Sequence, residues 1–202
     1  MFLKANYDAI ATQWQQARHT LPEKDAALFE LFASRLPNKA SILDLGCGHG
    51  SPIATWLSEL GHQIVGVDRS QQLLAQAKQK LPDQQWIHCE LEEYSITEQY
   101  HGVVIWDSLF HLPRDYHRPI LEQVFKALPE QGVVILSSGG SDEDIPAFTD
   151  YMFDIEFYYD ALPMAQLVKT CEEMGFTLVK RVMVNEPDGK RDKGRLGLVL
   201  TR

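Results

Sequence analysis

The 202-residue sequence lacks the features of a disulfide-stapled, membrane-spanning or metal-binding protein. Its few cysteines form no Cys-x-x-Cys pair, and its histidines show no metal-ligand spacing, so neither a disulfide framework nor a metal site is expected. No apolar run approaches the roughly 20 residues that span a bilayer. The first residues do not carry a basic and then an apolar segment, as an export signal does. These absences predict a cytoplasmic protein with reduced thiols and no membrane partner.

Positive charge is also scarce. Lys and Arg number 19 against 28 Asp and Glu, for a net charge of -9. Because phosphate contacts dominate nucleic-acid affinity, this balance argues against DNA or RNA as a partner. A basic cluster of Lys190, Arg191, Lys193 and Arg195 lies between Pro-Asp-Gly and a final apolar run. We interpret it as a solvated turn.

Short apolar runs alternate with amphipathic segments along most of the chain. Runs typical of strands lie at residues 41–45, 64–67, 86–89, 103–106, 133–136, 176–179 and 196–200. Segments with helical spacing of apolar residues lie at 53–60, 73–77, 120–128 and 163–174. This alternation predicts an α/β fold in which residues 1–202 form one domain around a doubly wound, mostly parallel seven-stranded sheet.

Two segments lie outside the alternation. Residues 1–37 are expected to be helical, since Pro22 can begin a helix whose apolar face ends near Pro37. Residues 139–160 are acidic and aromatic, without helix or strand periodicity. They follow the fifth strand, so they should emerge at the carboxyl edge of the sheet, where ligands bind in open α/β folds. They are predicted to form a small cap over the substrate, with a solvated acidic loop as the alternative.

The strongest chemical signal is the sequence Ile-Leu-Asp-Leu-Gly-Cys-Gly-His-Gly-Ser-Pro at residues 42–52. A buried strand runs into a glycine turn, where the backbone can adopt conformations and approach a ligand in ways that a Cβ would prevent. Asp68 ends the next strand, about 20 residues further on, where a carboxylate can accept hydrogen bonds from ribose hydroxyls. Together these features predict a ligand that contains a nucleoside.

The residues after the glycines narrow the identity of that nucleoside. A dinucleotide fingerprint would need a third glycine at position 51, which is Ser51. Pro52 removes a backbone donor that a pyrophosphate would use. An NAD-linked oxidoreductase therefore stays open as a less favoured alternative. A Walker phosphate loop is excluded, because the glycines do not lead into Gly-Lys-Ser/Thr.

These motifs resemble those of the class I S-adenosylmethionine-dependent methyltransferases, most closely between Ile42 and Leu136. Residues 44–50 are similar to the family's first motif, and residues 67–70 to its ribose-binding motif. Residues 106–112 match the segment that passes beside the methionine part of the cofactor. The resemblance implies a Rossmann-like methyltransferase fold, S-adenosyl-L-methionine as cofactor and a small-molecule methyl acceptor. A non-catalytic sensor or scaffold domain remains open, since methyl transfer requires no signature catalytic residue.

The resemblance also implies roles for individual residues. The backbones of Gly46 and Gly48 would approach the methionine moiety, and Asp44 would help to hold its ammonium. Leu91 would offer a backbone amide to the adenine, and Glu90 stands where the family more often has Asp. The cofactor-binding residues implied are Asp44, Gly46, Cys47, Gly48, Asp68, Arg69, Glu90, Leu91 and Trp106, with Tyr7, Trp14 and Arg18 in an N-terminal segment that can close over the cofactor. Arg18 could pair with the cofactor carboxylate.

Candidates for catalysis come after the fourth strand. His111 is a candidate general base, because histidine suits that role near neutral pH. Asp107 is a second candidate for the same role. The favoured alternative for His111 is a hydrogen bond to backbone and packing beneath the loop.

The acceptor's charge is suggested by residues 139–160. No Lys or Arg occurs between Lys126 and Lys169. The segment carries Asp142, Glu143, Asp144, Asp150, Asp154, Glu156 and Asp160 together with aromatic residues. Carboxylates and aromatic faces attract cations. The cap is therefore predicted to prefer a neutral or amine-bearing small molecule over an anion.

Overall fold

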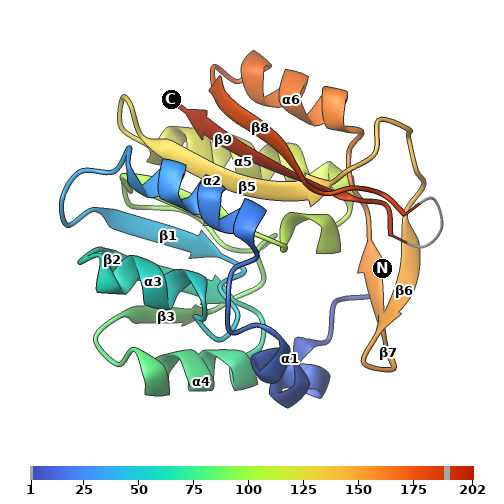
Figure 1. Ribbon diagram of the computed structural model, residues 1–202, viewed down its shortest axis with the longest axis horizontal. Helices are drawn as coiled ribbons and strands as arrows, with labels where there is room; N and C mark the ends of the chain where they lie inside the picture. The colour runs from blue at the N-terminus through green and yellow to red at the C-terminus, as the bar shows by residue number, and fades with distance from the viewer. Residues whose placement is uncertain (1, 189–191) are drawn as a thin grey trace.

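The computed structural model describes residues 2–188 and 192–202. At its centre is a seven-stranded sheet in the order β3-β2-β1-β4-β5-β9-β8 (Figure 1). Its strands are β1 (Ser41–Leu45), β2 (Gln63–Asp68), β3 (Gln85–His88), β4 (Gly102–Ile105), β5 (Val133–Gly139), β8 (Thr177–Asn185) and β9 (Arg195–Thr201). The first five are mutually parallel, and β9 is antiparallel to both β5 and β8. The predicted doubly wound, mostly parallel sheet is confirmed.

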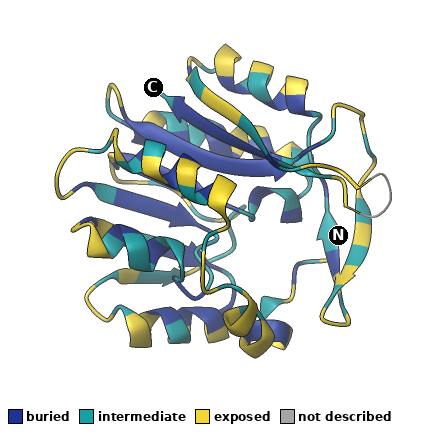
Figure 2. Ribbon diagram, viewed as in Figure 1, coloured by how far each residue is buried: buried dark blue, intermediate teal, exposed yellow. Residues whose placement is uncertain are grey.

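Both faces of the sheet are covered by helices. One core lies under α5 (His117–Ala127) and α6 (Met164–Glu173), and the other under α2 (Glu23–Ala33) and α3 (Ile53–Glu59). Successive strand residues point to opposite faces, so Ile42 enters one core and Leu43 the other. The central strands are consequently buried on both sides (Figure 2), which explains their nearly continuous apolar runs.

The strand order reverses between β1 and β4. From β1 the chain moves outward to β2, α4 (Gln71–Lys80) and β3, then crosses back to β4. Open α/β sheets bind ligands in the crevice at such a reversal, at the carboxyl ends of the strands. The glycine-rich loop after β1 and the segment after β4 therefore meet at this crevice.

Residues 1–37 contain the expected helices: η1 (Tyr7–Ile10), α1 (Ala11–Ala17) and α2. The Asp8 carboxylate fixes η1 to the start of α4, where it accepts hydrogen bonds from the Ser70 hydroxyl at 2.5 Å and the Gln72 amide at 3.0 Å. The described part of the chain contains no helix with both the length and the apolar character to cross a bilayer.

Residues 139–160 form two strands, although their sequence shows no strand periodicity. They contain an antiparallel hairpin of β6 (Phe148–Met152) and β7 (Ile155–Tyr159), which projects beyond the carboxyl edge of the sheet (Figure 1). Phe153 and Asp154 form its turn with positive φ values of 50° and 61°. The fully buried Phe157 packs with Ala5 and Ile10 in a third apolar cluster. The hairpin thus packs against the N-terminal segment.

Candidate active site

The glycine loop after β1 lines one wall of a cavity with exposed backbone. Gly46 and Gly48 have φ values of 84° and 55°, which side chains rarely adopt. A Cβ on Gly46 would lie 2.3 Å from the Ser108 Cβ. One on Gly48 would project between Trp14 and Leu73, which both line the same cavity, at 3.7 and 3.8 Å. Packing therefore requires glycine at position 46, whereas at position 48 the positive φ favours glycine and a Cβ would make only ordinary van der Waals contacts.

Asp68 fastens this loop at the end of β2. Its Oδ2 accepts a hydrogen bond from the Gly48 amide at 2.8 Å, and its Oδ1 accepts one from the Ser70 amide at 2.8 Å. Burial raises the pKa of Asp68, and these hydrogen bonds oppose the rise. Since a carboxylate can accept about four hydrogen bonds, it retains capacity for ribose hydroxyls.

One end of the cavity combines apolar surface with charge. Leu73 and Leu91 supply apolar side chains that suit a flat ring. Glu90 pairs with Arg69 at 3.3 Å and with Lys4 at 3.3 Å. These contacts hold the Glu90 carboxylate beside Leu91.

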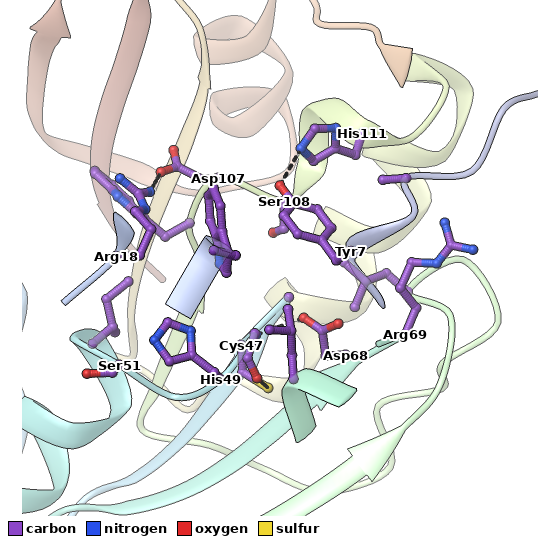
Figure 3. A pocket seen from close by; sticks show the side chains of 18 of the residues that line it. Tyr7, Arg18, Cys47, His49, Ser51, Asp68, Arg69, Asp107, Ser108 and His111 are labelled. Carbon is purple, nitrogen blue, oxygen red and sulfur yellow. Dashed lines mark hydrogen bonds and ion pairs between the residues drawn. The ribbon is translucent and has the colours of Figure 1, made fainter. Parts of the chain in front are cut away.

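The opposite end of the cavity carries paired charges. Asp107, the second residue after β4, has a positive φ of 54° and forms ion pairs with Arg18 and Arg195. Figure 3 shows the Arg18 side chain beside Asp107 at this end of the cavity. Burial alone would raise the pKa of Asp107, but the two guanidinium groups outweigh it and hold the pKa below its usual value. Asp107 is therefore an anion.

Arg195 joins this charged end of the site, although the sequence analysis did not place it there. Its side chain is 16% exposed and bridges Asp107 at 2.6 Å to Asp25 at 2.7 Å. Asp25 in turn accepts the indole N–H of Trp106 at 3.1 Å. The interpretation of the basic cluster as a solvated turn was wrong for Arg195, because this residue begins β9 and its side chain is largely buried against Asp107 and Asp25. Lys190 and Arg191 lie outside the described residues.

His111 has both ring nitrogens engaged. Nδ1 lies 2.9 Å from the Tyr158 carbonyl, and Nε2 lies 2.9 Å from the Tyr7 hydroxyl. Because a carbonyl only accepts, Nδ1 carries the proton and Nε2 accepts from Tyr7. Burial lowers the pKa of His111 to about 4. These contacts favour the packing role over the general base.

We expect His111→Ala to lose stability by about 1–3 kcal/mol, since the buried Tyr158 carbonyl and Tyr7 hydroxyl lose their partner. If the site transfers methyl groups, as the sequence resemblance implies, the variant should retain measurable turnover. Thermal unfolding and turnover with labelled cofactor would measure the two effects. A general base is typically worth ~10²–10⁴-fold in rate. A folded variant with wild-type cofactor affinity and a larger loss of turnover would contradict the packing role.

The pH dependence of stability gives a further check on the same variant. The folded pKa of His111, about 4, lies below the unfolded value of about 6.5. The neutral ring therefore contributes stability above pH ~6.5, which is lost as the pH falls toward 4. We expect His111→Ala to flatten the decline of the unfolding free energy across this window.

Most of the predicted cofactor residues meet in one cavity. It is lined by Gly46, Cys47, Gly48, Asp68, Arg69, Glu90, Leu91, Trp106, Tyr7, Trp14 and Arg18. Asp44 is buried within β1 and is not among the lining residues; burial raises its pKa to about 7. Over residues 2–188 and 192–202, no cluster of three or more His, Cys, Asp or Glu could hold a metal ion.

A second cavity of about 470 Å³ adjoins the first. The end of β5, the hairpin and the start of β9 line it. Its aromatic wall stacks Phe148 on Tyr159 at 5.4 Å and Phe110 on Tyr159 at 6.0 Å. Arg195 lines this cavity and Asp107 the first, so their ion pair lies between the two.

The carboxylates of residues 139–160 do not converge on one point. Asp144 and Asp160 pair with Arg114 at 2.5 and 2.7 Å, and Glu156 accepts a hydrogen bond from Thr149. Asp150, Glu143 and Asp160 line the second cavity.

The sheet is mostly parallel, the glycine loop at residues 46–50 follows β1 and forms a cradle of bare backbone, and Asp68 is the last residue of β2. These features are those of a nucleotide-cofactor-binding domain of the doubly wound class. Residues 42–132 match the methyltransferase domain family. YqeM of Bacillus subtilis (strain 168), a candidate methyltransferase, is 28% identical over 70% of this chain and 61% of its own length. The trans-aconitate 2-methyltransferase of Azoarcus sp. (strain BH72) is 33% identical over 60% and 48%. The chain thus spans less than two thirds of each relative.

The fold is also similar to that of a solved methyltransferase structure. An S-adenosylmethionine-dependent methyltransferase structure from Clostridium acetobutylicum superposes with a TM-score of 0.71 and 16% identity, covering 96% of this chain and 98% of that one. The match of residues 42–132 and the shared fold both relate this chain to S-adenosylmethionine-dependent methyltransferases.

Proposed function

We propose that the protein binds S-adenosylmethionine in the first cavity and transfers its methyl group to a small molecule in the cytoplasm. One observation supports the assignment: the Asp68 carboxylate accepts the Gly48 amide at 2.8 Å, so the group that we propose binds the ribose is held against the glycine loop. The cysteines, all free thiols, are consistent with a reducing compartment.

The residues present fit this cofactor. A Cβ at position 48 would enter the cradle, so the floor can take a ligand directly against backbone. The Asp68 end offers acceptors for ribose hydroxyls. The Asp107 end holds an anion beside the Arg18 cation, which complements the ammonium and carboxylate of an amino acid.

The protein's contribution to the reaction is alignment. When bound, the cofactor supplies an electrophilic methyl group on a sulfonium. Tyr7 and Trp14 line the cavity and pack in the cluster that contains Phe157 of the hairpin. This cover excludes water and restricts the approach of an acceptor, and orientation alone can supply much of a rate enhancement.

Calorimetry with S-adenosylhomocysteine and NAD tests the cofactor assignment. We expect the first to bind and the second not to; the reverse would favour an oxidoreductase. Methyl incorporation from labelled cofactor into a metabolite panel tests catalysis. Binding without any product across the panel would favour a sensor or scaffold.

We further propose that residues 139–160 cap the acceptor site and that the acceptor is neutral or bears an amine. The support is the second cavity, where carboxylates outnumber cations: Glu143, Asp150, Asp160, Asp188 and Asp192 stand against Lys193 and Arg195. Aromatic faces add a preference for cations. The Azoarcus relative is named for an anionic acceptor, which this charge balance disfavours.

Once an acceptor is found, we expect Asp150→Asn to raise the KM for that acceptor about fivefold. This factor corresponds to the binding free energy of one partly exposed charge pair. Asp150 lines the second cavity, whereas Asp154 lies in the hairpin turn and lines neither cavity. Asp154→Asn is therefore the matched control and should leave the KM unchanged. A KM indifferent to Asp150→Asn, or a phosphate or polycarboxylate as the best acceptor, would defeat the proposal.

A further inference from the structure

The His49 ring is buried in the first cavity without a hydrogen-bond partner. The residue is 1% exposed, and neither ring nitrogen meets hydrogen-bond geometry with any group of the described residues. The Arg18 backbone carbonyl is near enough to favour the protonated ring but forms no hydrogen bond with it. Buried polar groups without a partner are rare and costly to fold. A ligand atom is therefore a natural partner for His49.

The position of His49 defines which part of a ligand it can meet. Figure 3 shows the ring rising from the glycine loop on the side of Ser51 and Arg18, away from Asp68 and Arg69. All of these residues line the same cavity. Since Asp68 is the ribose-binding carboxylate, His49 faces the part of the cofactor that extends beyond the ribose.

We propose that His49 donates a hydrogen bond to the carboxylate of the cofactor's amino-acid end. This assignment rests on the proposed function, because it takes S-adenosylmethionine as the ligand. The neighbours of the ring favour the carboxylate over the ammonium. Arg18 is the adjacent cation, and two donors together suit a carboxylate. Asp107, the anion paired with Arg18, offers the ammonium its acceptor.

The protonation state of His49 is compatible with this role. Burial lowers the pKa of His49 to about 4, and the positive charges of Lys80 and Arg18 act in the same direction. The ring is therefore neutral near pH 7 and keeps one N–H donor. Arg18 supplies the positive charge at this end of the cavity, and the His49 N–H supplies a directional hydrogen bond to the carboxylate.

Calorimetric titration of three ligands tests the assignment. S-adenosylhomocysteine carries the carboxylate and the ammonium, its decarboxylated analogue carries the ammonium alone, and 5′-methylthioadenosine carries neither. We expect His49→Ala to weaken binding of S-adenosylhomocysteine about tenfold, as for one hydrogen bond to a charged group. Affinity for the other two ligands should not change. His49→Gln keeps an N–H donor and should recover part of the loss.

The controls separate this inference from the proposed function and from folding. His62 is a buried histidine that accepts the Ala40 amide at 3.2 Å and does not line the cavity. His62→Ala should lower thermal stability without changing the ratio of the three affinities.

Three results would overturn the role of His49. Equal weakening of all three ligands would mean a structural role. Weakening of the two amine-bearing ligands alone would mean an ammonium partner. No weakening would mean no contact. If the wild type bound no S-adenosylhomocysteine, the proposed function itself would fail. If His49→Ala did not fold, His49→Gln would be titrated with the same three ligands and judged by the same ratios.

Discussion

Gly48→Val should reduce the affinity for S-adenosylhomocysteine by ~10²-fold or more. The new Cβ would project between Trp14 and Leu73, into the space above the cradle. Its branches would fill the position where bare backbone meets the ligand, and the φ of 55° adds strain of about 1–3 kcal/mol. Calorimetry measures the affinity, and circular dichroism checks the fold.

Gly61→Val is a matched control for backbone strain. Gly61 also has a positive φ, 88°, but a Cβ there would meet nothing within 4 Å. The variant should lose stability and still bind S-adenosylhomocysteine normally. If Gly48→Val bound the ligand as well as Gly61→Val does, the cradle would not be the ligand's floor.

Asp68→Ala should also weaken binding of S-adenosylhomocysteine, because Asp68 hydrogen-bonds the same glycine loop. The variant loses acceptors for the Gly48 and Ser70 amides as well as for ribose hydroxyls. Hydrogen bonds to a charged group are worth roughly 1.5–3 kcal/mol each. Weaker binding by a folded Asp68→Ala protein is expected, and unchanged affinity in both Asp68→Ala and Gly48→Val would defeat the cofactor assignment.

The cofactor end of the site could be predicted because its determinants are local. The glycines follow β1 within one short motif, and Asp68 ends the neighbouring parallel strand, whose register pairs Leu45 with Val67. Parallel strands bring their carboxyl ends to the same edge. The strand pattern and the spacing of about 20 residues were therefore sufficient to predict that the glycine loop and Asp68 lie side by side.

The hairpin could not be predicted from periodicity because its strands have no uniformly buried face. Along β6, burial alternates only between intermediate and exposed. The hairpin packs against the N-terminal segment through β7, where Phe157 contacts the cluster that contains Ile10. A strand that covers a small cluster needs few apolar residues, so the alternation that marks a core strand is weak.

His111 shows an intermediate case. Its place after β4 could be predicted, since the post-strand segment is near the ligand crevice. Its partners could not, because Tyr7 is 104 positions away and Tyr158 lies in the hairpin. The partners decide the chemistry: a ring that donates to a carbonyl and accepts from a phenol has both nitrogens engaged in packing contacts.

Arg195→Met should lower the unfolding free energy by about 3–5 kcal/mol, the usual cost of breaking a buried ion pair by removing one partner. Asp25 has a side chain that is 1% exposed, and that of Asp107 is 12% exposed. Both carboxylates lose a guanidinium, and Asp107 keeps the Arg18 ion pair and the hydrogen bond from the Ser137 hydroxyl. Chemical denaturation at neutral pH measures the loss.

Arg181→Met is the control for removing an arginine as such. Its side chain is 40% exposed and lies 4.0 Å from an exposed carboxylate, Asp142, so its loss should cost less than about 1 kcal/mol. A double variant, Asp25→Asn with Arg195→Met, should be more stable than Arg195→Met alone, because one uncompensated buried charge is removed.

The destabilisation should also depend on pH with a definite sign. In the wild type the guanidinium groups hold the pKa of Asp107 below its usual value, so ionised Asp107 contributes stability above the unfolded pKa of about 3.9. That contribution is lost as the pH falls through the folded pKa. Without Arg195 much of it is absent at every pH, so the gap between wild type and variant should narrow below pH ~4. A gap that stayed constant into acid, or a cost equal to that of Arg181→Met, would mean that Arg195 acts through packing of its aliphatic stem rather than by compensating the buried carboxylates.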